Sequence, residues 1–327
     1  MRTVVTGSIA TDHLLTFPGS FADQLIADQL DRVSLSFLAD RLDIRRGGVA
    51  ANICYGLGLL GLRPVLVGAA GTDFEPYRVH LKEHGVDTDS VHISTDLHTA
   101  RFVCTTDRRQ NQIATFYAGA MAEARTIDLC DVVARVGRLA LVVISPDDPQ
   151  AMLRHTAACR QHDIPFAADP SQQLARLNRA EVRQLVEGAR WLFSNEYEAA
   201  LLQERSGWTA DQIRARVGCW ITTLGEDGVR LQSADRAPVV IPAVPVEGVV
   251  DPTGVGDAFR AGFVAAATRG VPLADAARLG CAIAATALDY IGTQEYRLYR
   301  DPLLARLRNA YGIAVPARIL PHLRELT

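Results

Sequence analysis

Short runs of β-branched and apolar residues alternate along the chain with longer segments rich in Ala and Leu, and this alternation constrains the fold most strongly. The runs with the character of buried strands are 3–7, 64–71, 141–145, 165–170, 191–195 and 220–225. The segments of helical character are 50–60, 149–162, 180–188, the stretch from Glu196, 256–269 and 273–288. A β-α-β-α order predicts a mostly parallel sheet with helices on both faces, and functional loops at the carboxyl ends of the strands.

Two early regions break this order. Residues 32–48 alternate apolar and polar side chains, as a half-exposed strand pair would, and residues 98–120 predict a β-hairpin with its turn near 107–110. Together with residues 12–17 they predict a small separate sheet. Because the chain shows no internal repeat or low-complexity linker, we expect one domain, 1–327, in which this sheet forms a lid on an α/β body.

Composition excludes several classes of function. Hydrophobic residues make up 48% of the 327, enough for a sizeable core, and the net charge of −3 comes from both signs scattered along the chain. Such a distribution gives no footprint for nucleic acid or an anionic membrane. The apolar runs are too short to span a bilayer, the N-terminus has no charged-then-apolar leader, and the six cysteines form no C-x-x-C pair. We therefore expect a cytoplasmic protein with reduced thiols.

Residues 56–61 read GLGLLG, which matches the G-x-G-x-x-G pattern of dinucleotide-binding turns. That turn requires a strand before the glycines and a helix after them. Here the glycines end a helical stretch and a strand follows, so the pattern indicates close helix packing and a helix stop. A nicotinamide-dependent enzyme is excluded on this ground.

The stretch VDPTGVGDAFRAGF, residues 250–263, lies between strand-like residues 237–246 and a helix. Its glycines are therefore expected at a helix N-terminus, where free N–H groups and the helix dipole favour an anion. Asp257 falls in the first helical turn. It has two open interpretations, a helix-start residue with no other role or a base that accepts a proton from a hydroxyl while the N–H groups stabilise a transferred phosphoryl group.

Four motifs occur in an order that resembles the ribokinase-like (PfkB) carbohydrate and nucleoside kinases. They are RGGVAANICYGLGLLG with VGAAGTD (46–73), SNEYE (194–198), TTLGEDG (222–228) and DPTGVGDAFRAGF (251–263). Val255 departs from the family, which commonly has Ala there, but the anion-binding donors are backbone N–H groups and the change should cost little. Within the family the chain is most similar to the actinobacterial adenosine kinases, nearly end to end except for the last thirty or so residues.

The resemblance implies a ribokinase-like three-layer α/β/α domain with a mostly parallel central sheet and a small β-sheet lid. It implies ATP-dependent phosphorylation of the 5′-hydroxyl of adenosine to give AMP in purine salvage. Asp257 would be the general base, and the N–H groups of Gly254, Val255, Gly256 and Asp257 would form the anion hole. Two alternatives stay open: a ribokinase-like kinase of ribose, fructose or a related sugar, and a non-catalytic nucleoside-binding regulator.

The resemblance also implies where adenosine binds. The residues placed around it are Ser8, Asp12, Ser36, Gly48, Asn52, Phe102, Phe116, Gln172, Gln173, Arg176 and Asp257. The two phenylalanines would stack on the adenine, although both would also suit the buried face of the lid. Asp12 has the alternative of an ordinary turn or cap residue, and the two serines have no distinctive signal of their own.

The nucleotide and metal sites follow from the same resemblance. The residues placed near ATP are Asn195, Thr223, Gly225, Gly228, Gly254 and Gly256. Asn195 and Glu198 would hold Mg²⁺ through water, although a first-turn Glu is common in any helix. Asp251 and Thr253 would line a site for a monovalent cation such as K⁺. The exposed lid edges suggest a homodimer formed through the lid.

Overall fold

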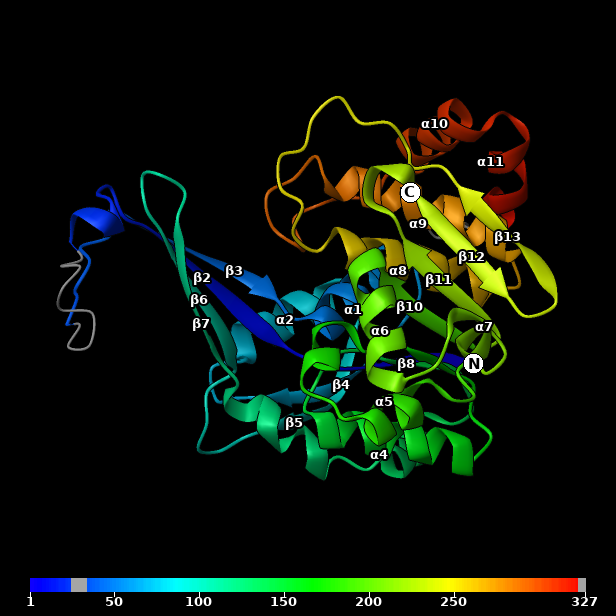
Figure 1. Cartoon of the computed structure of the whole chain (residues 1–327), viewed down its shortest axis with the longest axis horizontal. Coiled ribbons are helices and arrows are strands. Elements are labelled where there is room, and N and C mark those ends of the chain that lie inside the picture. Colours follow the sequence, from blue (N-terminus) through cyan, green and yellow to red (C-terminus); the bar gives the residue numbers. More distant parts are fainter. Residues whose placement is uncertain (25–33, 323–327) are drawn as a thin grey trace.

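The computed structural model describes residues 1–24 and 34–322, which form two sheets with helices packed on the larger one (Figure 1). The larger sheet has the order β13-β12-β11-β10-β9-β8-β1-β4-β5. Its strands are β1 (Arg2–Thr6), β4 (Val65–Ala70), β5 (Asp87–Ile93), β8 (Leu139–Ile144), β9 (Phe166–Ala168), β10 (Trp191–Asn195), β11 (Cys219–Thr223), β12 (Val229–Ser233) and β13 (Arg236–Ile241). Neighbours pair in parallel from β5 to β11, and β12 and β13 extend the sheet antiparallel.

Two apolar cores lie on the two faces of this sheet. Val4 belongs to one and Val5 to the other, because successive side chains of a strand point to opposite faces. The helices on the Val5 side are α1 (Val49–Leu59), α2 (Glu75–Glu83), α8 (Val255–Ala267), α9 (Leu273–Ala287), α10 (Arg300–Tyr311) and α11 (Ala314–Ile319). Those on the Val4 side are α3 (Leu129–Val136), α4 (Pro149–Gln161), α5 (Arg179–Val186), α6 (Glu196–Ser206) and α7 (Ala210–Arg214). The predicted three-layer α/β/α arrangement is confirmed.

Membrane crossing would need a longer and more apolar helix than any of these. Within residues 1–24 and 34–322, no helix meets both requirements.

The glycines of the GLGLLG stretch serve packing, as predicted. A methyl group on Gly56, inside α1, would lie 2.6 Å from the Cβ of Ala261 in α8, and β4 follows these glycines instead of preceding them.

Glycines also let α8 and α9 approach each other closely. A methyl group built on Gly262 would lie 2.9 Å from the Cα of Gly280, and one built on Gly280 would lie 2.7 Å from the ring of Phe259. Because α8 is buried from Asp257 to Ala267, this contact fixes the position of the helix that begins within the 251–263 motif.

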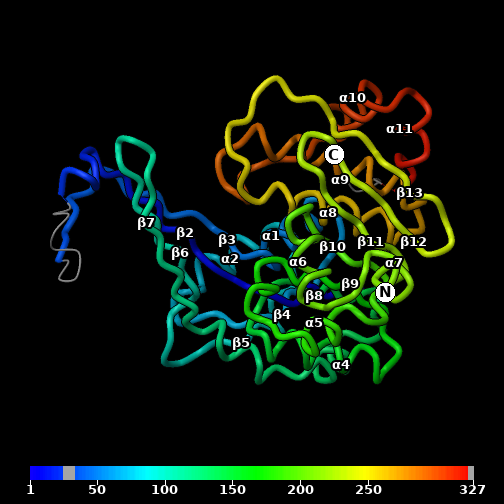
Figure 2. The backbone as a smooth tube through the Cα atoms, in the orientation of Figure 1, coloured from blue at the N-terminus to red at the C-terminus, as the bar shows by residue number. Residues whose placement is uncertain are grey.

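The smaller sheet has the order β3-β2-β6-β7 and extends away from one end of the body (Figure 2). Its strands are β2 (Ala10–Thr16), β3 (Arg41–Gly47), β6 (Ala100–Thr106) and β7 (Gln112–Tyr117). β6 and β7 form the expected hairpin. Its turn is held by Asp107, whose Oδ1 accepts from the N–H groups of Arg109 and Asn111 at 2.8 and 2.9 Å. We call this sheet the lid.

The strand pair expected within residues 32–48 is wrong in its first half. Residues 32–33 lie outside the described part of the chain, 34–40 contain no strand, and only Arg41–Gly47 forms one. The ring of Phe37 instead packs against two phenylalanine rings that follow β2, at centroid distances of 5.0 and 4.8 Å. The apolar alternation there reflects an aromatic cluster, which leaves the same short pattern as a pleated strand.

Replacing Gly262 by Ala should destabilise the protein by about 1–3 kcal/mol, because the methyl group has no space against the α9 backbone. Urea unfolding measures the change in free energy. Gly248→Ala is the matched control, since nothing lies within 4 Å of its added methyl group, and its effect should stay below about 0.5 kcal/mol. Equal stabilities of the two variants would contradict this account of the helix contact.

Candidate active site

The N-terminus of α8 separates two cavities. The first, of about 460 Å³, lies between this helix end and the lid. The sequence-predicted residues that line it are Ser8, Asp12, Gly48, Asn52, Phe102, Phe116, Gln172, Gln173, Arg176, Thr253, Gly254 and Asp257. The predicted residues that line the second cavity, of about 180 Å³, are Thr223, Gly225, Gly228, Val255 and Gly256. Consecutive residues of one helix end thus face two cavities, which suits transfer of a group from a ligand in one to a ligand in the other.

The helix end itself is built to hold an anion. Gly254 is the N-cap of α8 and has φ 75°, a left-handed conformation that suits glycine. A Cβ there would also lie 2.8 Å from the side chain of Thr293. Val255, Gly256 and Asp257 form the first turn, where N–H groups have no acceptor within the helix. These donors and the positive end of the helix dipole favour a phosphate at this position.

Asp257 lies in this first turn with a buried carboxyl group. Burial raises its pKa to about 6, against the opposing effects of the Arg260 guanidinium and a hydrogen bond from Asn52 Nδ2 at 2.9 Å. The group is therefore ionised at neutral pH and has a pKa nearer to neutrality than an exposed Asp. Such a carboxylate can accept a proton from a hydroxyl in the first cavity.

Arg260 stands one turn along α8 and forms a buried ion pair with Asp169, the residue that follows β9. Arg260 Nη2 donates to Asp169 Oδ1 at 2.7 Å, and both side chains are at most 10% exposed. The pair fixes a cation next to the helix end, since a methyl group on Gly256 would lie 2.8 Å from Arg260 Nη1. Neither Arg260 nor Asp169 was among the predicted site residues, although Arg260 lies within the quoted motif.

The lid contributes an apolar wall with one carboxylate. Phe102 and Phe116 are cross-strand partners on β6 and β7, so their side chains share one face. Asp12 pairs with Phe102 from the neighbouring β2. Burial and the nearby charge of Asp251 raise the pKa of Asp12 to about 6. Phe116 is 52% exposed although it lines the cavity, and an apolar ring left open in this way suits a planar ligand.

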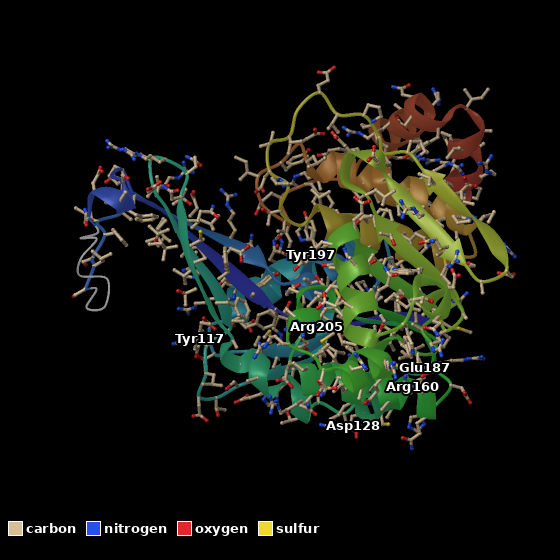
Figure 3. The ribbon with its side chains drawn as sticks, viewed as in Figure 1. Tyr117, Asp128, Arg160, Glu187, Tyr197 and Arg205 are labelled. Atoms are coloured by element: carbon tan, nitrogen blue, oxygen red, sulfur yellow. The ribbon has the colours of Figure 1, made fainter. Side chains whose placement is uncertain are left out.

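Gln172, Gln173 and Arg176 lie in or just after the short helix Ser171–Ala175, at the carboxyl end of β9. The Oε1 atom of Gln173 is buried, with no hydrogen-bond partner in the described part of the chain. A buried acceptor without a partner costs free energy, which a ligand donor in the cavity would offset. Two residues labelled in Figure 3 help to locate the site: Tyr117 directly follows Phe116 on β7, and Tyr197 lies in the first turn of α6.

Asn195 and Glu198 form a capping box at the start of α6. Asn195 Oδ1 accepts from Glu198 N at 2.7 Å, and Glu198 Oε2 accepts from Asn195 N at 2.8 Å. Glu198 Oε1 accepts from the hydroxyl of Ser171, a residue held at the unusual φ of 43°. Neither residue lines the two cavities described above. Within residues 1–24 and 34–322, no group of three or more His, Cys, Asp or Glu is placed to hold a metal ion.

Asp251 and Thr253 shape the loop before α8. Asp251 Oδ1 accepts from the N–H group of Thr253 at 2.8 Å, and Oδ2 accepts from the N–H group of Gly292 at 2.9 Å. Both carboxylate oxygens of Asp251 therefore accept from backbone N–H groups.

Ser8, in the first cavity, accepts from the N–H group of Val49 at 3.0 Å and so supports the start of α1.

Ser36 is a predicted substrate-binding residue that the structure does not bring to the first cavity. It is exposed, outside the cavity, in the segment that lacks a strand. Its placement relied on resemblance alone, since the serine has no spacing or pattern that marks a site. The structure adds Thr293 and Gln294, which contact Asn52, and Tyr77, which contacts Gln294. No sequence pattern marks these residues, because they lie far from Asn52 along the chain.

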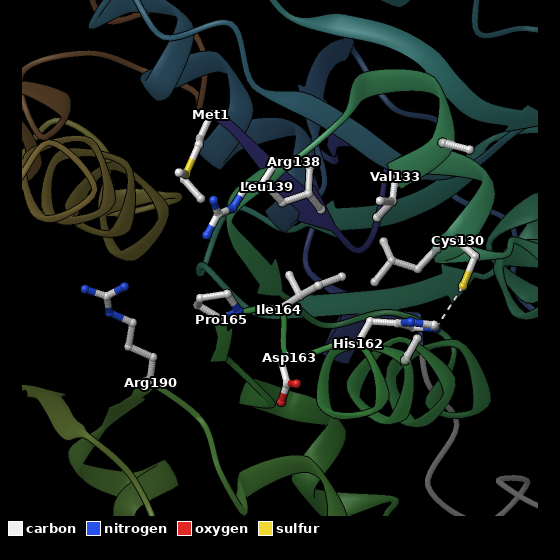
Figure 4. A pocket seen from close by; sticks show the side chains of 14 residues that line it. Met1, Cys130, Val133, Arg138, Leu139, His162, Asp163, Ile164, Pro165 and Arg190 are labelled. Carbon is white, nitrogen blue, oxygen red and sulfur yellow. Dashed lines mark hydrogen bonds between the residues drawn. The ribbon is translucent and has the colours of Figure 1, made fainter.

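A larger cavity, of about 820 Å³, opens at the amino ends of the central strands, where β8, β9 and β10 begin (Figure 4). Cys130 and His162 lie at one end of it, with Sγ and Nε2 3.3 Å apart, and Arg138 and Arg190 lie toward the other. None of the predicted site residues lines it. Because ligands of open α/β sheets bind at the carboxyl ends of the strands, we assign the reaction to the two cavities at α8.

Residues 12–298 match the pfkB family of carbohydrate kinases. A nucleoside kinase of Methanothermobacter thermautotrophicus is 32% identical over 271 residues, which cover 82% of this chain and 86% of that protein. A solved nucleoside kinase of Burkholderia thailandensis in complex with inosine is 34% identical, with a TM-score of 0.83 over 95% of this chain and 99% of that one. A ribokinase of Cryptococcus neoformans, 23% identical, shares the fold with a TM-score of 0.72 over 90% of this chain and 96% of that one.

The fold is that of the ribokinase-like kinases. The chain belongs to the pfkB family of carbohydrate kinases. The expected family is thus confirmed. The two nucleoside kinases described above come from an archaeon and a bacterium. They do not confirm the expected specific similarity to the actinobacterial adenosine kinases.

Asp257→Asn should stabilise the protein at pH 8 by about 1–3 kcal/mol, because it removes a buried charge. The folded-state pKa of about 6 lies above the ordinary value of 3.8, so the ionised carboxyl costs stability above pH 6. The cost falls as the pH drops through 6 toward 4. Urea unfolding at pH 8 and pH 4.5 checks this, and an equal difference between variant and wild type at both pH values would contradict it.

Proposed function

We propose that the protein transfers the γ-phosphoryl group of ATP to the 5′-hydroxyl of a nucleoside, with adenosine as the favoured acceptor and AMP as the product. The observation that carries the proposal is the N-terminus of α8, which places N–H groups that lack an acceptor within the helix between two cavities, and the Asp257 carboxylate at one of them. Asp257 accepts the hydroxyl proton, and the N–H groups from Gly254 to Asp257 stabilise the transferred group. As part of the proposal, the enzyme works in the cytoplasm in purine salvage.

The first cavity favours a nucleoside over a bare sugar. Phe102 and Phe116 offer adjacent apolar rings for a base, and the free Gln173 Oε1 offers an acceptor for the exocyclic amine of adenine. Asp12 and Asn52 supply polar atoms for ribose hydroxyls, with Gly48 and Ser8 beside them. The names of the two relatives, both nucleoside kinases, support the same class of acceptor.

The second cavity suits the donor nucleotide. Its wall joins Thr223, Gly225 and Gly228 of the β11–β12 turn to apolar residues of α8 and α9. Gly228 has φ 97°, so the turn suits glycine. Arg176, on the acceptor side, would offset the charge of the transferred phosphoryl group.

ATP use by this family implies a divalent metal such as Mg²⁺, which would neutralise phosphate charge during transfer. Asn195 and Glu198 fit an indirect role, because the capping box and the Ser171 hydroxyl already occupy their oxygens and leave contacts through water. A monovalent cation such as K⁺ near Asp251 and Thr253 belongs to the proposal as well. It would act on the loop that precedes Gly254.

We further propose a homodimer formed through the lid. Leu38, Leu42, Ile44 and Ile113 are all at least 47% exposed on or beside its strands. Exposed apolar side chains on edge strands favour association with another chain. Light scattering coupled to size-exclusion chromatography distinguishes a dimer from a monomer.

Exchanging both Phe102 and Phe116 for Ala should raise KM for adenosine at least tenfold, because two stacking surfaces are lost at about 1–3 kcal/mol per base. Initial rates of ADP formation with adenosine, inosine, cytidine, ribose and fructose as acceptors measure the effect. If wild type turns over sugars but no nucleoside, the acceptor is wrong and a sugar kinase takes its place. If no acceptor is turned over, a nucleoside-binding regulator is favoured.

Asp257→Asn should lower kcat by about 10² to 10⁴ with little change in adenosine affinity, since the variant binds but cannot accept the proton. In wild type, kcat/KM should fall about tenfold per pH unit below pH 6, where Asp257 of the free enzyme becomes protonated. Rates across pH 5 to 9 and calorimetric binding of adenosine test both statements. A near-normal rate for the variant would rule out Asp257 as the base.

A further inference from the structure

A chain of hydrogen bonds runs from Asp257 to the backbone at the base of the lid. Asn52 Nδ2 donates to Asp257 Oδ2 at 2.9 Å, and Asn52 Oδ1 accepts from Gln294 Nε2 at 2.8 Å. Gln294 Nε2 also donates to the hydroxyl of Tyr77, which donates to the carbonyl oxygen of Gly47 at 2.9 Å. All four side chains are buried. Gly47 is the last residue of the lid strand β3.

The last acceptor sets the direction of every bond in this chain. A backbone carbonyl can only accept, so the single hydrogen of the Tyr77 hydroxyl goes to Gly47, and the Tyr77 oxygen accepts from Gln294. Gln294 therefore presents its NH₂ group, whose two hydrogens go to Tyr77 and Asn52. Asn52 must then turn Oδ1 toward Gln294 and Nδ2 toward Asp257. The reverse orientation would set Asn52 Oδ1 against the carboxylate and would require Asp257 to be protonated.

Thr293 also contacts Asn52 but does not set its orientation. Its Oγ1 lies 2.8 Å from Asn52 Oδ1 and 2.8 Å from the carbonyl oxygen of Arg46, also in β3. A hydroxyl has one hydrogen, so it donates to one of these oxygens at a time. When the hydrogen goes to Asn52, Thr293 agrees with the orientation described above. When it goes to Arg46, the hydroxyl oxygen would accept from an Asn52 N–H group instead. The orientation of Asn52 therefore rests on Gln294 and Tyr77.

We propose that Gln294 and Tyr77 are positioning residues, which act through Asn52 to keep Asp257 an unprotonated base, with the lid strand β3 as their anchor. This proposal rests on the kinase activity proposed above. Neither Gln294 nor Tyr77 lines the acceptor cavity, so their effect reaches the reaction only through Asn52 and Asp257. The state of the base is thereby linked to the position of the lid.

Other charged and titratable groups also face Asp257. Arg260 on α8 favours its ionised form, whereas Asp169 after β9 and Glu198 on α6 oppose it. Tyr296, buried on the α1 side, is a further titratable neighbour. These groups remain in place when Tyr77 or Gln294 is replaced, so a change in the titration of Asp257 reports on the hydrogen-bond chain.

Tyr77→Phe removes the hydroxyl that fixes the direction of the chain, and Gln294→Met removes both amide donors. We expect the Asp257 carboxyl to titrate about 0.5–1 pH unit higher in Y77F and further upward in Q294M, because its hydrogen bond from Asn52 is no longer enforced. The acid limb of kcat/KM should move by the same amount, with kcat at pH 8.5 within about threefold of wild type in Y77F. Carboxyl NMR of aspartate-labelled protein, with D257N to identify the resonance, measures the titration directly.

Tyr55→Phe is the matched control. Tyr55 is also buried, and its hydroxyl donates to a backbone carbonyl, that of Tyr296, at 2.8 Å, but it has no place in the chain to Asp257. It should lower the unfolding temperature about as much as Y77F and leave the Asp257 titration unchanged. If Y77F and Q294M lose stability but titrate like wild type, both residues are structural and the proposal is overturned.

Failure of the proposed function gives a different result. Wild type would then turn over no nucleoside, while the NMR titration, which needs no turnover, would still show whether Y77F and Q294M raise the pKa of Asp257. An unshifted resonance in both variants rejects the positioning role whatever the acceptor is.

Discussion

Burial of the Asp257 carboxylate is the constraint on which the rest of the site depends. An ionised carboxyl group taken out of water is unfavourable unless donors and cations face it. Here one donor comes from Asn52 on α1 and one cation from Arg260, which is itself paired with Asp169 at the end of β9. Three elements distant in sequence must therefore pack to within a few ångströms for this carboxyl group to ionise near neutral pH. The close contact of α8 with α9 at Gly262 and Gly280 holds α8 in the position where its Asp257 meets Asn52.

Much of the body follows from local sequence. Buried strands of a parallel sheet read as continuous apolar runs, and the helices between them have amphipathic or Ala-rich sequences, so the layers and the position of the α8 N-terminus were predictable. Local pattern failed at residues 34–40, where Phe37 packs with two other rings and forms no strand. The resemblance placed Ser36 near the acceptor, whereas the structure leaves it exposed and outside the first cavity.

The roles of single residues were harder to predict, because they depend on partners far along the chain. Asn52 was expected to contact a sugar, and it does line the cavity, but its amide is also held between Asp257 and Gln294. The Asn195 and Glu198 spacing was interpreted as a metal site, and the same spacing is that of a capping box, which the structure contains. The same motif can cap the helix and take part in a metal site, since the capping box also fixes the position of the Glu198 carboxylate.

Asp12 of the lid and Asp257 of the body both line the first cavity, and burial raises the pKa of each to about 6. Near that pH each of the two carboxyl groups is partly protonated. A ligand whose hydroxyl groups donate to the two carboxylates favours their ionised forms, so its arrival expels those protons into the buffer. Acceptor binding is then coupled to proton release, and the observed heat of binding near pH 6 depends on the ionisation enthalpy of the buffer that takes the protons up.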